Sequence, residues 1–589
     1  MTTDIYGFFR DSIVIMLVWF LLATSFFIWG RFFSKLLKIK ITGKIGIVAN
    51  IWLGWVFSIF LFAIYNLFLP INVFTSSLFY IPAIIVFFVR YSKKIPNLIK
   101  SISQIKIVAI ILTLFVASTV AIQLPMNFDT GLYHFNNIRW ANEYHIIKGL
   151  GNLHTRLGFN QLFFLYAASL NFHPFFNDYA FHVANSFLYA LFFITMVIGS
   201  TSLDLILLCL FFFIPMPYFW INNPTPDMAS TLIQIVIFRF FIEVIYYKKE
   251  NKWNYLAFVA VLTTILISLK LSNGLFALGL GLISLLIIKR YPLEKNDRNI
   301  IKHVVVFMFL YFFVWVIRGY IQTGYPLFPS KIGYINFDWK VPSVLAEQTE
   351  KKIYAYARLN NYDYNSPLLK DWGWIDSWLK ESFFNPDNDF GNNWITNIYT
   401  VILMIFFPML MIYWGISSLT LLVLSSILFS IWFWALLSKK NIWKNSETLI
   451  YLYITEITSI LFWFFVAPNP RFANAIFIIL FANSLLLVKQ AYPYLKIGKK
   501  GKDFLLFFSF FMFIVCFYND YSANEFMISK MYVLKKLPMN EYKTKTGLKI
   551  LVPANGEQPW DSNLPATPEP EANLALRGSN LDDGFYIKE

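Results

Sequence analysis

The chain has 589 residues, of which 58% are hydrophobic and only 14% are charged. A soluble domain carries about 25% charged residues, so this composition excludes soluble, disordered and collagen-like chains. The net charge is +16, which on a membrane protein indicates loops retained in the cytoplasm rather than nucleic-acid binding. Cys209 and Cys516 lie in apolar runs and imply no disulfide framework. The sequence therefore predicts an all-α polytopic membrane protein.

A bilayer core about 30 Å thick needs about 20 apolar residues per helix. On this criterion we expect spans at 12–30, 45–68, 76–90, 107–124, 178–199, 203–220, 228–247, 254–270, 273–289, 303–322, 396–414, 417–437, 449–466, 472–489 and 503–519.

Six short segments hold about half of the 49 Lys and Arg residues, and an excess of basic residues predicts the cytoplasmic side. These segments are 31–44, 90–106, 246–252, 289–302, 439–444 and 489–502. Three expected spans separate 289–302 from 439–444, but two segments on the same side of a membrane need an even number of crossings between them. Both segments can therefore lie inside only if 396–414 and 417–437 together cross once. We therefore expect about 14 crossings, with both termini outside.

The spans and loops divide the chain into five parts. Residues 1–106 are extra N-terminal membrane helices, and 107–322 form a core that carries the first outer loop, 125–177. A large outer loop follows at 323–395, then membrane helices at 396–519 and an outer tail at 520–589. Apolar residues of the tail, such as Trp560 and Phe585, indicate that it packs on another part of the chain.

Two acidic residues stand at outer ends of the expected spans. Asp129 begins the first outer loop, and Asp227 follows Asn222-Asn-Pro-Thr-Pro at the start of a later span. Either carboxylate could cap a helix N-terminus, because an Asp there accepts backbone hydrogen bonds. The other interpretation is functional: a carboxylate at the membrane surface can act as a general base.

Three cations stand at separate helix ends on the outer side, against the bias that places basic residues inside. They are Lys270, in a break between two spans, Arg318 and Arg471. Lys270 could simply extend towards the headgroups, but an ionisable residue at membrane depth by default marks a site. Because Arg and Lys bind phosphate oxygens, we expect the three to converge on one anion, such as a lipid phosphate.

Polar and aromatic residues of the outer loops are candidates for the same cavity. We assign to it Tyr133, His134, Arg139, Glu143 and Tyr325. Five of the six histidines fall between His134 and His182, but their spacing matches no compact zinc pattern. We predict no metal ligands and no required cofactor, although a divalent metal is left open.

These motifs, in this order and on this side, resemble those of the GT-C superfamily of integral membrane glycosyltransferases. The nearest branch contains the protein O-mannosyltransferases and aminoarabinose transferases, and the resemblance covers roughly 107–490. It implies that Asp129 is the catalytic acid of the first outer loop, that Asp227 opens a later span, and that Lys270 and Arg471 are the family's outer cations. The family often has a second acid beside the first, where this chain has Thr130.

The resemblance implies a glycosyltransferase at the outer face of a bacterial inner membrane. The expected partners are a polyprenyl-phosphate-linked sugar, a surface-glycan or lipid-glycan acceptor, and membrane lipid, with no nucleic acid. Asp129 would act as the base, while Lys270, Arg318 and Arg471 would bind the donor phosphate. A polymerase of lipid-linked O-antigen or capsule units uses the same leaving group and stays open, as does a lipid-linked glycan transporter.

Overall fold

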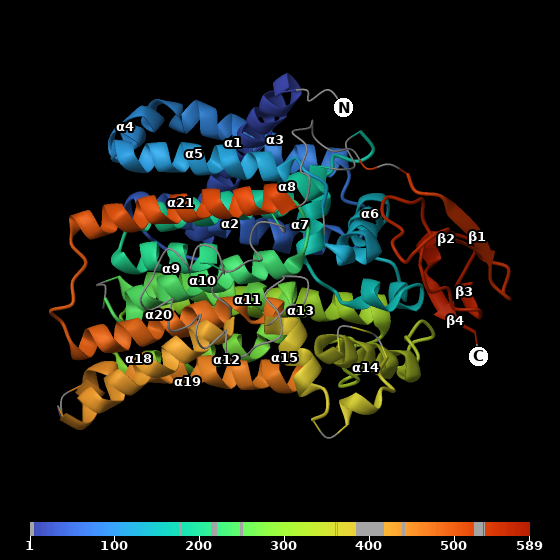
Figure 1. Ribbon diagram of the computed structural model, residues 1–589. Coiled ribbons are helices and arrows are strands. Elements are labelled where there is room, and N and C mark those ends of the chain that lie inside the picture. The colour runs from blue at the N-terminus through green and yellow to red at the C-terminus, as the bar shows by residue number, and fades with distance from the viewer. Residues whose placement is uncertain are drawn as a thin grey trace.

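The structure is a computed structural model that describes residues 5–125, 127–175, 179–213, 221–247, 251–359, 361, 363–370, 372–383, 418–438, 442–523, 534 and 536–588. Within these ranges the chain is a bundle of long helices, with the strands and the helices α6 (Phe135–Glu143) and α14 (Ser343–Leu359) at one end (Figure 1).

The first ten labelled helices are α1 (Ile5–Leu36), α2 (Gly43–Tyr65), α3 (Val73–Tyr91), α4 (Ile95–Lys100), α5 (Gln104–Ala121), α6 (Phe135–Glu143), α7 (Phe163–Ser169), α8 (Tyr179–Gly199), α9 (Ser202–Phe213) and α10 (Pro226–Ile245). The others are α11 (Lys252–Leu269), α12 (Gly274–Arg290), α13 (Lys295–Thr323), α14 (Ser343–Leu359), α15 (Ile375–Phe383), α18 (Ser418–Ser438), α19 (Ile442–Val466), α20 (Asn474–Ala491) and α21 (Lys499–Ala523).

The helices agree with the spans expected from the sequence. Among the described residues, 11 helices are long and apolar enough to cross a membrane. Two shorter apolar helices, Ser202–Phe212 and Leu421–Leu437, add to these. The protein is thus a polytopic helical membrane protein. The span expected at 396–414 lies outside the described residues, so the count of about 14 crossings stays a prediction.

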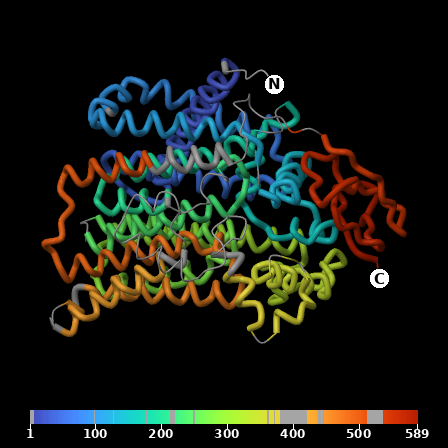
Figure 2. The backbone as a smooth tube through the Cα atoms, in the orientation of Figure 1, coloured from blue at the N-terminus to red at the C-terminus, as the bar shows by residue number. Residues whose placement is uncertain are grey.

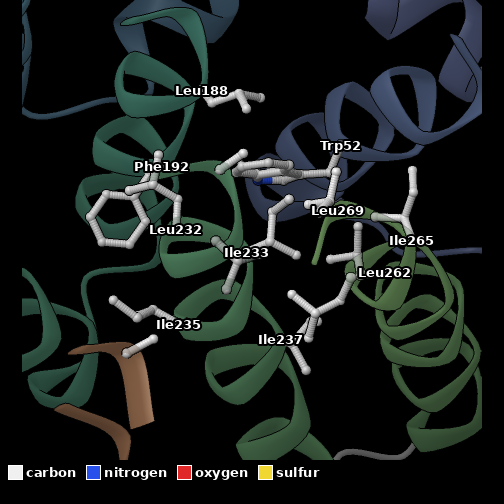
Figure 3. Close-up of a cluster of buried hydrophobic side chains, with 14 of the residues drawn as sticks. Trp52, Leu188, Phe192, Leu232, Ile233, Ile235, Ile237, Leu262, Ile265 and Leu269 are labelled. Atoms are coloured by element: carbon white, nitrogen blue, oxygen red, sulfur yellow. The ribbon is translucent and has the colours of Figure 1, made fainter. Parts of the chain in front are cut away.

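The helices at the centre of the bundle bury mainly apolar side chains. Trp52 of α2 contacts a cluster from α8, α10 and α11 that includes Leu188, Ile233 and Leu269 (Figure 3). Peripheral helices instead expose large apolar side chains, such as Leu285 of α12 and Phe309 of α13. This pattern is expected where lipid replaces water as the solvent.

A buried ionic network ties α9 to α10 inside the bundle. Arg239 bonds to Asp204 at 2.9 Å and pairs with Glu243 at 3.1 Å, and all three side chains are nearly inaccessible. Burying these charges is tolerable only because each cationic and anionic group has a partner. This network was not predicted from the sequence.

The described residues of the six basic segments lie at one end of the bundle, as their predicted common side requires. Lys44 donates to the carbonyl of Ser101, the Lys40 amide donates to Asn254, and Arg290 pairs with Glu447 at 2.7 Å. In Figure 1 the C-terminal end of α18, the start of α19 and the turn between α20 and α21 lie at this end, with α4. We call it the basic end.

The opposite end carries α6, α14, α15 and residues 536–588 of the tail, which form two antiparallel hairpins. The first pairs β1 (Met539–Lys543) with β2 (Lys549–Pro553), and the second pairs β3 (Leu574–Leu576) with β4 (Phe585–Ile587). These strands were not predicted. Figure 2 shows the tail in red beside the first outer loop in cyan.

The tail packs on another part of the chain, as its apolar residues predicted, and that part is the first outer loop. The Trp560 amide donates to the carbonyl of Gly131 at 2.9 Å, and the Phe585 amide donates to that of Lys148 at 2.9 Å. Arg139 adds a 2.8 Å ion pair with Asp561. Phe585 is completely buried. The tail is therefore a structural part of this end and not a free linker.

Replacing Gly131 is expected to loosen this docking. A Cβ atom at Gly131 would lie 2.4 Å from the indole ring of Trp560, and such overpacking costs about 1–3 kcal/mol. We expect Gly131→Ala to raise the rate of limited proteolysis in 554–566 roughly tenfold or more. Gly498→Ala, at a site with nothing within 4 Å, is the control. Equal protection of the two variants would contradict the proposed contact.

Candidate functional site

Four charged residues that are far apart in the sequence meet at the end that carries the tail. Asp129 follows α5, Asp227 lies in the first turn of α10, Lys270 lies between α11 and α12, and Arg471 lies between α19 and α20. Together with Arg156 of the first outer loop they form one ionic cluster, which we call the charge cluster.

The contacts in the charge cluster form a continuous chain of ion pairs. Arg156 Nη1 lies 2.9 Å from Asp129 Oδ1, and Arg471 Nη2 lies 3.2 Å from Asp129 Oδ2. The Arg471 Nε atom lies 3.8 Å from Asp227 Oδ2, and Lys270 Nζ donates to Asp227 Oδ1. Three cations and two carboxylates leave one net positive charge, which suits a bound monoanion.

The carboxylate of Asp129 is available for these ion pairs because Asn127, and not Asp129, caps the local turn. The Asp129 amide donates to Asn127 Oδ1 at 2.8 Å, and the turn from Thr130 to His134 is a short π-helix. The Asp129 side chain makes no capping bond, so the interpretation of Asp129 as a cap is wrong. Single-turn π-helices are frequent at functional sites.

Asn223 connects the segment that carries Asp129 to the segment that carries Asp227. Its Oδ1 accepts from the Asn127 amide at 3.0 Å and from Thr130 Oγ1 at 3.1 Å. Two residues later Thr225 caps α10 by accepting from the Asp227 amide. The expected cap signal before α10 is therefore real, but Thr225 supplies it, and the Asp227 carboxylate points to Lys270 and Arg471 instead.

Lys270 reaches the charge cluster because α11 stops one residue before it. Lys270 has an extended backbone (φ −156°, ψ 124°), and Asn273 fixes the break by donating to Ser230 Oγ at 2.7 Å. The ammonium group stands 3.3 Å from the centre of the Phe472 ring. A cation–π contact of this kind compensates part of the lost hydration.

Burial and charge act against each other at these groups. Burial alone would raise the pKa of Asp129, but Arg471 and Arg156 outweigh it and hold this pKa below its usual value. Burial lowers the pKa of Lys270 to about 8, although Asp227 favours the charged form. For Arg471 burial would lower the pKa, but Asp129 and Asp227 raise it above its usual value. Asp129 and Arg471 are therefore ionised at neutral pH.

A cavity of about 590 Å³ opens on the charge cluster. The five charged residues line it together with Tyr133 and His134, as expected for these two. Its apolar wall includes Ile267, Leu271, Phe328, Phe462, Phe465 and Phe472. Glu350 and Lys352 of α14 and Glu557 and Glu569 of the tail also line the cavity. A polar end beside an apolar wall suits an amphiphile with an anionic group.

Two buried histidines line the same cavity, and their titration predicts a pH dependence of stability. Burial lowers the pKa of His134 to about 4 and that of His154 to about 3. The unfolded chain binds these protons below about pH 6.5, whereas the folded chain binds them only below about pH 4 and pH 3. We therefore expect the free energy of unfolding to fall as the pH drops from about 6.5 to 4, by about 3 kcal/mol for His134 alone.

Unfolding in lipid nanodiscs, followed between pH 4 and 8, measures this effect. His134→Asn should show a clearly smaller loss of stability on acidification than the wild type. His145→Asn changes a half-exposed histidine of the same loop and should keep the wild-type dependence. If the wild type and His134→Asn lost the same stability between pH 6.5 and 4, this pH dependence would not be due to His134.

The structure corrects the expectation for Arg318. This side chain is 2% exposed and donates to the Ala63 carbonyl at 3.2 Å and to Asn66 Oδ1 at 3.1 Å. Both acceptors lie at the C-terminal end of α2, where the helix dipole favours a cation. Arg318 therefore holds α13 against α2, and it does not join Lys270 and Arg471.

Three of the expected cavity residues also lie elsewhere. Tyr325 is completely buried, and its hydroxyl donates to the Val341 carbonyl at 2.9 Å. Arg139 pairs with Glu143 at 2.6 Å and with Asp561 of the tail at 2.8 Å. Arg139 and Glu143 lie one turn apart on α6, where Arg139 anchors the tail, and neither lines the cavity.

Arg156 is the functional candidate that the sequence analysis missed. It bonds to Asp129 and stands 5.5 Å from the centre of the Tyr133 ring. The signal was available, because Arg156 is one of only three basic residues in 125–177. Like Lys270, Arg156 is an outward cation where few others occur.

No metal centre is formed by the described residues. Within them, no group of three or more His, Cys, Asp or Glu side chains is arranged to hold an ion. Asp129 and Asp227, the two carboxylates of the cavity floor, are instead engaged by Arg and Lys.

Comparison with known proteins identifies a family whose description names no activity. No curated protein and no solved structure matches the chain. A family model described as a domain of unknown function, DUF8201, matches residues 13–478. This range covers most of the chain and includes all five members of the charge cluster. The chain therefore belongs to the DUF8201 family.

Proposed function

We propose that this protein is a membrane glycosyltransferase of the GT-C type that uses a polyprenyl-phosphate-linked sugar. The observation that carries the proposal is the convergence of Asp129, Asp227, Lys270 and Arg471 on one cavity, since the resemblance selects these four residues. The cavity joins cations to an apolar wall, which is the chemistry of a phosphate attached to a lipid chain. In this proposal the cavity faces the outside of a bacterial inner membrane, and the basic end faces the cytoplasm.

The proposed reaction is a displacement at the anomeric carbon. The hydroxyl oxygen of the acceptor forms a bond to this carbon while the bond to the phosphate oxygen breaks. The electron pair leaves with the lipid phosphate, and the hydroxyl proton passes to Asp129. Lys270 and Arg471 stabilise the departing phosphate, as fixed cations in a water-poor site do. General-base assistance of this kind contributes about 10²–10⁴-fold in rate.

Entry of the donor would also prepare Asp129 as a base. Before the donor binds, Arg471 and Arg156 hold the pKa of Asp129 below its usual value, which makes a poor base. A phosphate that takes Arg471 and Lys270 as partners removes part of this attraction and adds a negative charge. Both changes raise the pKa of Asp129, so the base becomes effective only when the donor is bound.

Profiling of lipid-linked and surface glycans in a strain that lacks the protein tests the proposal. We expect an unused polyprenyl-phosphate sugar to accumulate and one sugar to disappear from a surface glycan. Complementation with the wild-type chain should reverse both changes. Unchanged glycans would overturn the proposal. Retention of single repeat units with loss of long glycan chains would indicate that the protein is a polymerase instead.

A further inference from the structure

A second large cavity lies at the basic end, far from the charge cluster. Its volume is about 800 Å³. It lies between the C-terminal turn of α1, the start of α2 and the C-terminal turn of α3. Helix α2 starts at this cavity and ends beside Arg318 of α13. Trp315, one turn before Arg318 on α13, lines the cavity of the charge cluster. The two cavities therefore lie at opposite ends of the bundle. We call this cavity the basic pocket.

The charges that line the basic pocket are all of one sign. They are Arg31, Lys35, Lys38, Lys40 and Arg90. No acidic residue lines the pocket, and none of these five cations pairs with a carboxylate of the described chain. At the same end, by contrast, Arg290 does pair with Glu447. Five cations with no acid around one hollow repel one another, and an anion would relieve that repulsion.

The walls of the basic pocket are apolar and continue onto an exposed apolar surface. Phe27, Ile28, Leu53 and Val86 line it. Phe32, which lines it too, and Ile85, Phe88 and Val89 beside it on α3 are largely exposed. A small soluble anion would use the cations but not this surface. A phospholipid would use both, with its phosphate on the cations and its acyl chains along α1 and α3.

Two further features suit a lipid phosphate at this place. The guanidinium of Arg31 is held 5.4 Å from the centre of the Tyr91 ring. This contact fixes the direction in which the guanidinium N–H groups point. The start of α2 also faces the pocket, and its N-cap Thr42 makes no side-chain capping bond. The partial positive charge of a helix N-terminus adds to the five cations.

We propose that the basic pocket binds an anionic phospholipid with two phosphates, of the cardiolipin type. One phosphate would neutralise only part of five clustered charges, whereas two linked phosphates neutralise more of them at once. Basic pockets between membrane helices on the cytoplasmic side commonly bind such headgroups. This site is independent of the proposed transfer reaction, because none of its residues lines the cavity of the charge cluster.

Lipid binding to the purified full-length chain tests the proposal. Native mass spectrometry and thermal shift in detergent would compare cardiolipin, phosphatidylglycerol, phosphatidylethanolamine and inorganic pyrophosphate. We expect cardiolipin to bind most tightly and pyrophosphate alone not to stabilise the protein. The triple variant Arg31→Gln, Lys35→Gln, Arg90→Gln should weaken cardiolipin binding roughly a hundredfold, since each basic residue near an anionic lipid contributes about fivefold.

The matched control is Lys496→Gln, Lys499→Gln, Lys500→Gln, which removes three exposed charges from the same end outside the pocket. It should change the affinity by less than about fivefold, the contribution of one basic residue. Equal loss in the two variants would overturn the site, because the effect would then be that of overall charge. Equal affinity for phosphatidylglycerol would overturn the two-phosphate assignment, and stabilisation by pyrophosphate would overturn the lipid. Arg31, Lys35 and Arg90 are exposed. In the absence of lipid, the triple variant of the pocket should therefore melt near the temperature of the wild type.

Discussion

Asp129→Asn is expected to lower the turnover of lipid-linked sugar by about 10²–10⁴-fold without weakening donor binding. The amide cannot take the proton of the acceptor hydroxyl. It also no longer neutralises Arg156 and Arg471, which lie 2.9 and 3.2 Å from the carboxylate oxygens. The cavity then becomes more positive, and the KM for the anionic donor should fall or stay constant while kcat collapses.

Glu347→Gln is the matched control for this prediction. Glu347 pairs with two cations, Lys331 at 3.1 Å and Lys351 at 2.9 Å, as Asp129 pairs with Arg156 and Arg471. It lies on α14 outside the cavity and is exposed, so its loss should leave kcat unchanged. Proteoliposome assays with a radiolabelled lipid-linked sugar separate kcat from KM. Near wild-type turnover by Asp129→Asn would refute the base assignment, and a raised KM with constant kcat would assign Asp129 to binding.

The membrane helices were predictable because their signal is local. A run of apolar residues such as 252–269 specifies both a helix and its burial, since an unpaired backbone is too costly in lipid. The side of each loop followed from Lys and Arg counts in the same way. The hairpins of the tail were not predicted, because short strands such as Leu574–Leu576 carry little periodicity and depend on contacts with the first outer loop.

The charge cluster was predictable only in part, for a reason that Arg318 and Lys270 illustrate. Both are outward cations in apolar surroundings, and the sequence assigns them the same role. The structure separates them by their partners, since Arg318 meets helix carbonyl and amide oxygens at α2 while Lys270 meets Asp227. Which oxygen faces a cation depends on how distant helices pack, and one sequence does not contain that information in a local pattern.

Lys270→Met is expected to destabilise the protein by about 3 kcal/mol, because it leaves the carboxylate of Asp227 buried without its nearest cation. The side chains of Lys270 and Asp227 are only 17% and 11% exposed. Arg471, 3.8 Å from Asp227, retains part of the compensation, so the chain should still fold. Transfer activity should be lost as well, since the departing phosphate loses a fixed positive charge.

The double variant Lys270→Met, Asp227→Asn separates the structural role of the pair from its role at the site. Removing both charges leaves no uncompensated ion, so stability should return to within about 1 kcal/mol of the wild type. Activity should not return, because the donor phosphate still lacks Lys270. Thermal unfolding in nanodiscs and the proteoliposome assay would be measured on the same preparations. Recovery of activity together with stability would show that Lys270 serves only to neutralise Asp227, and the phosphate would then depend on Arg471 alone.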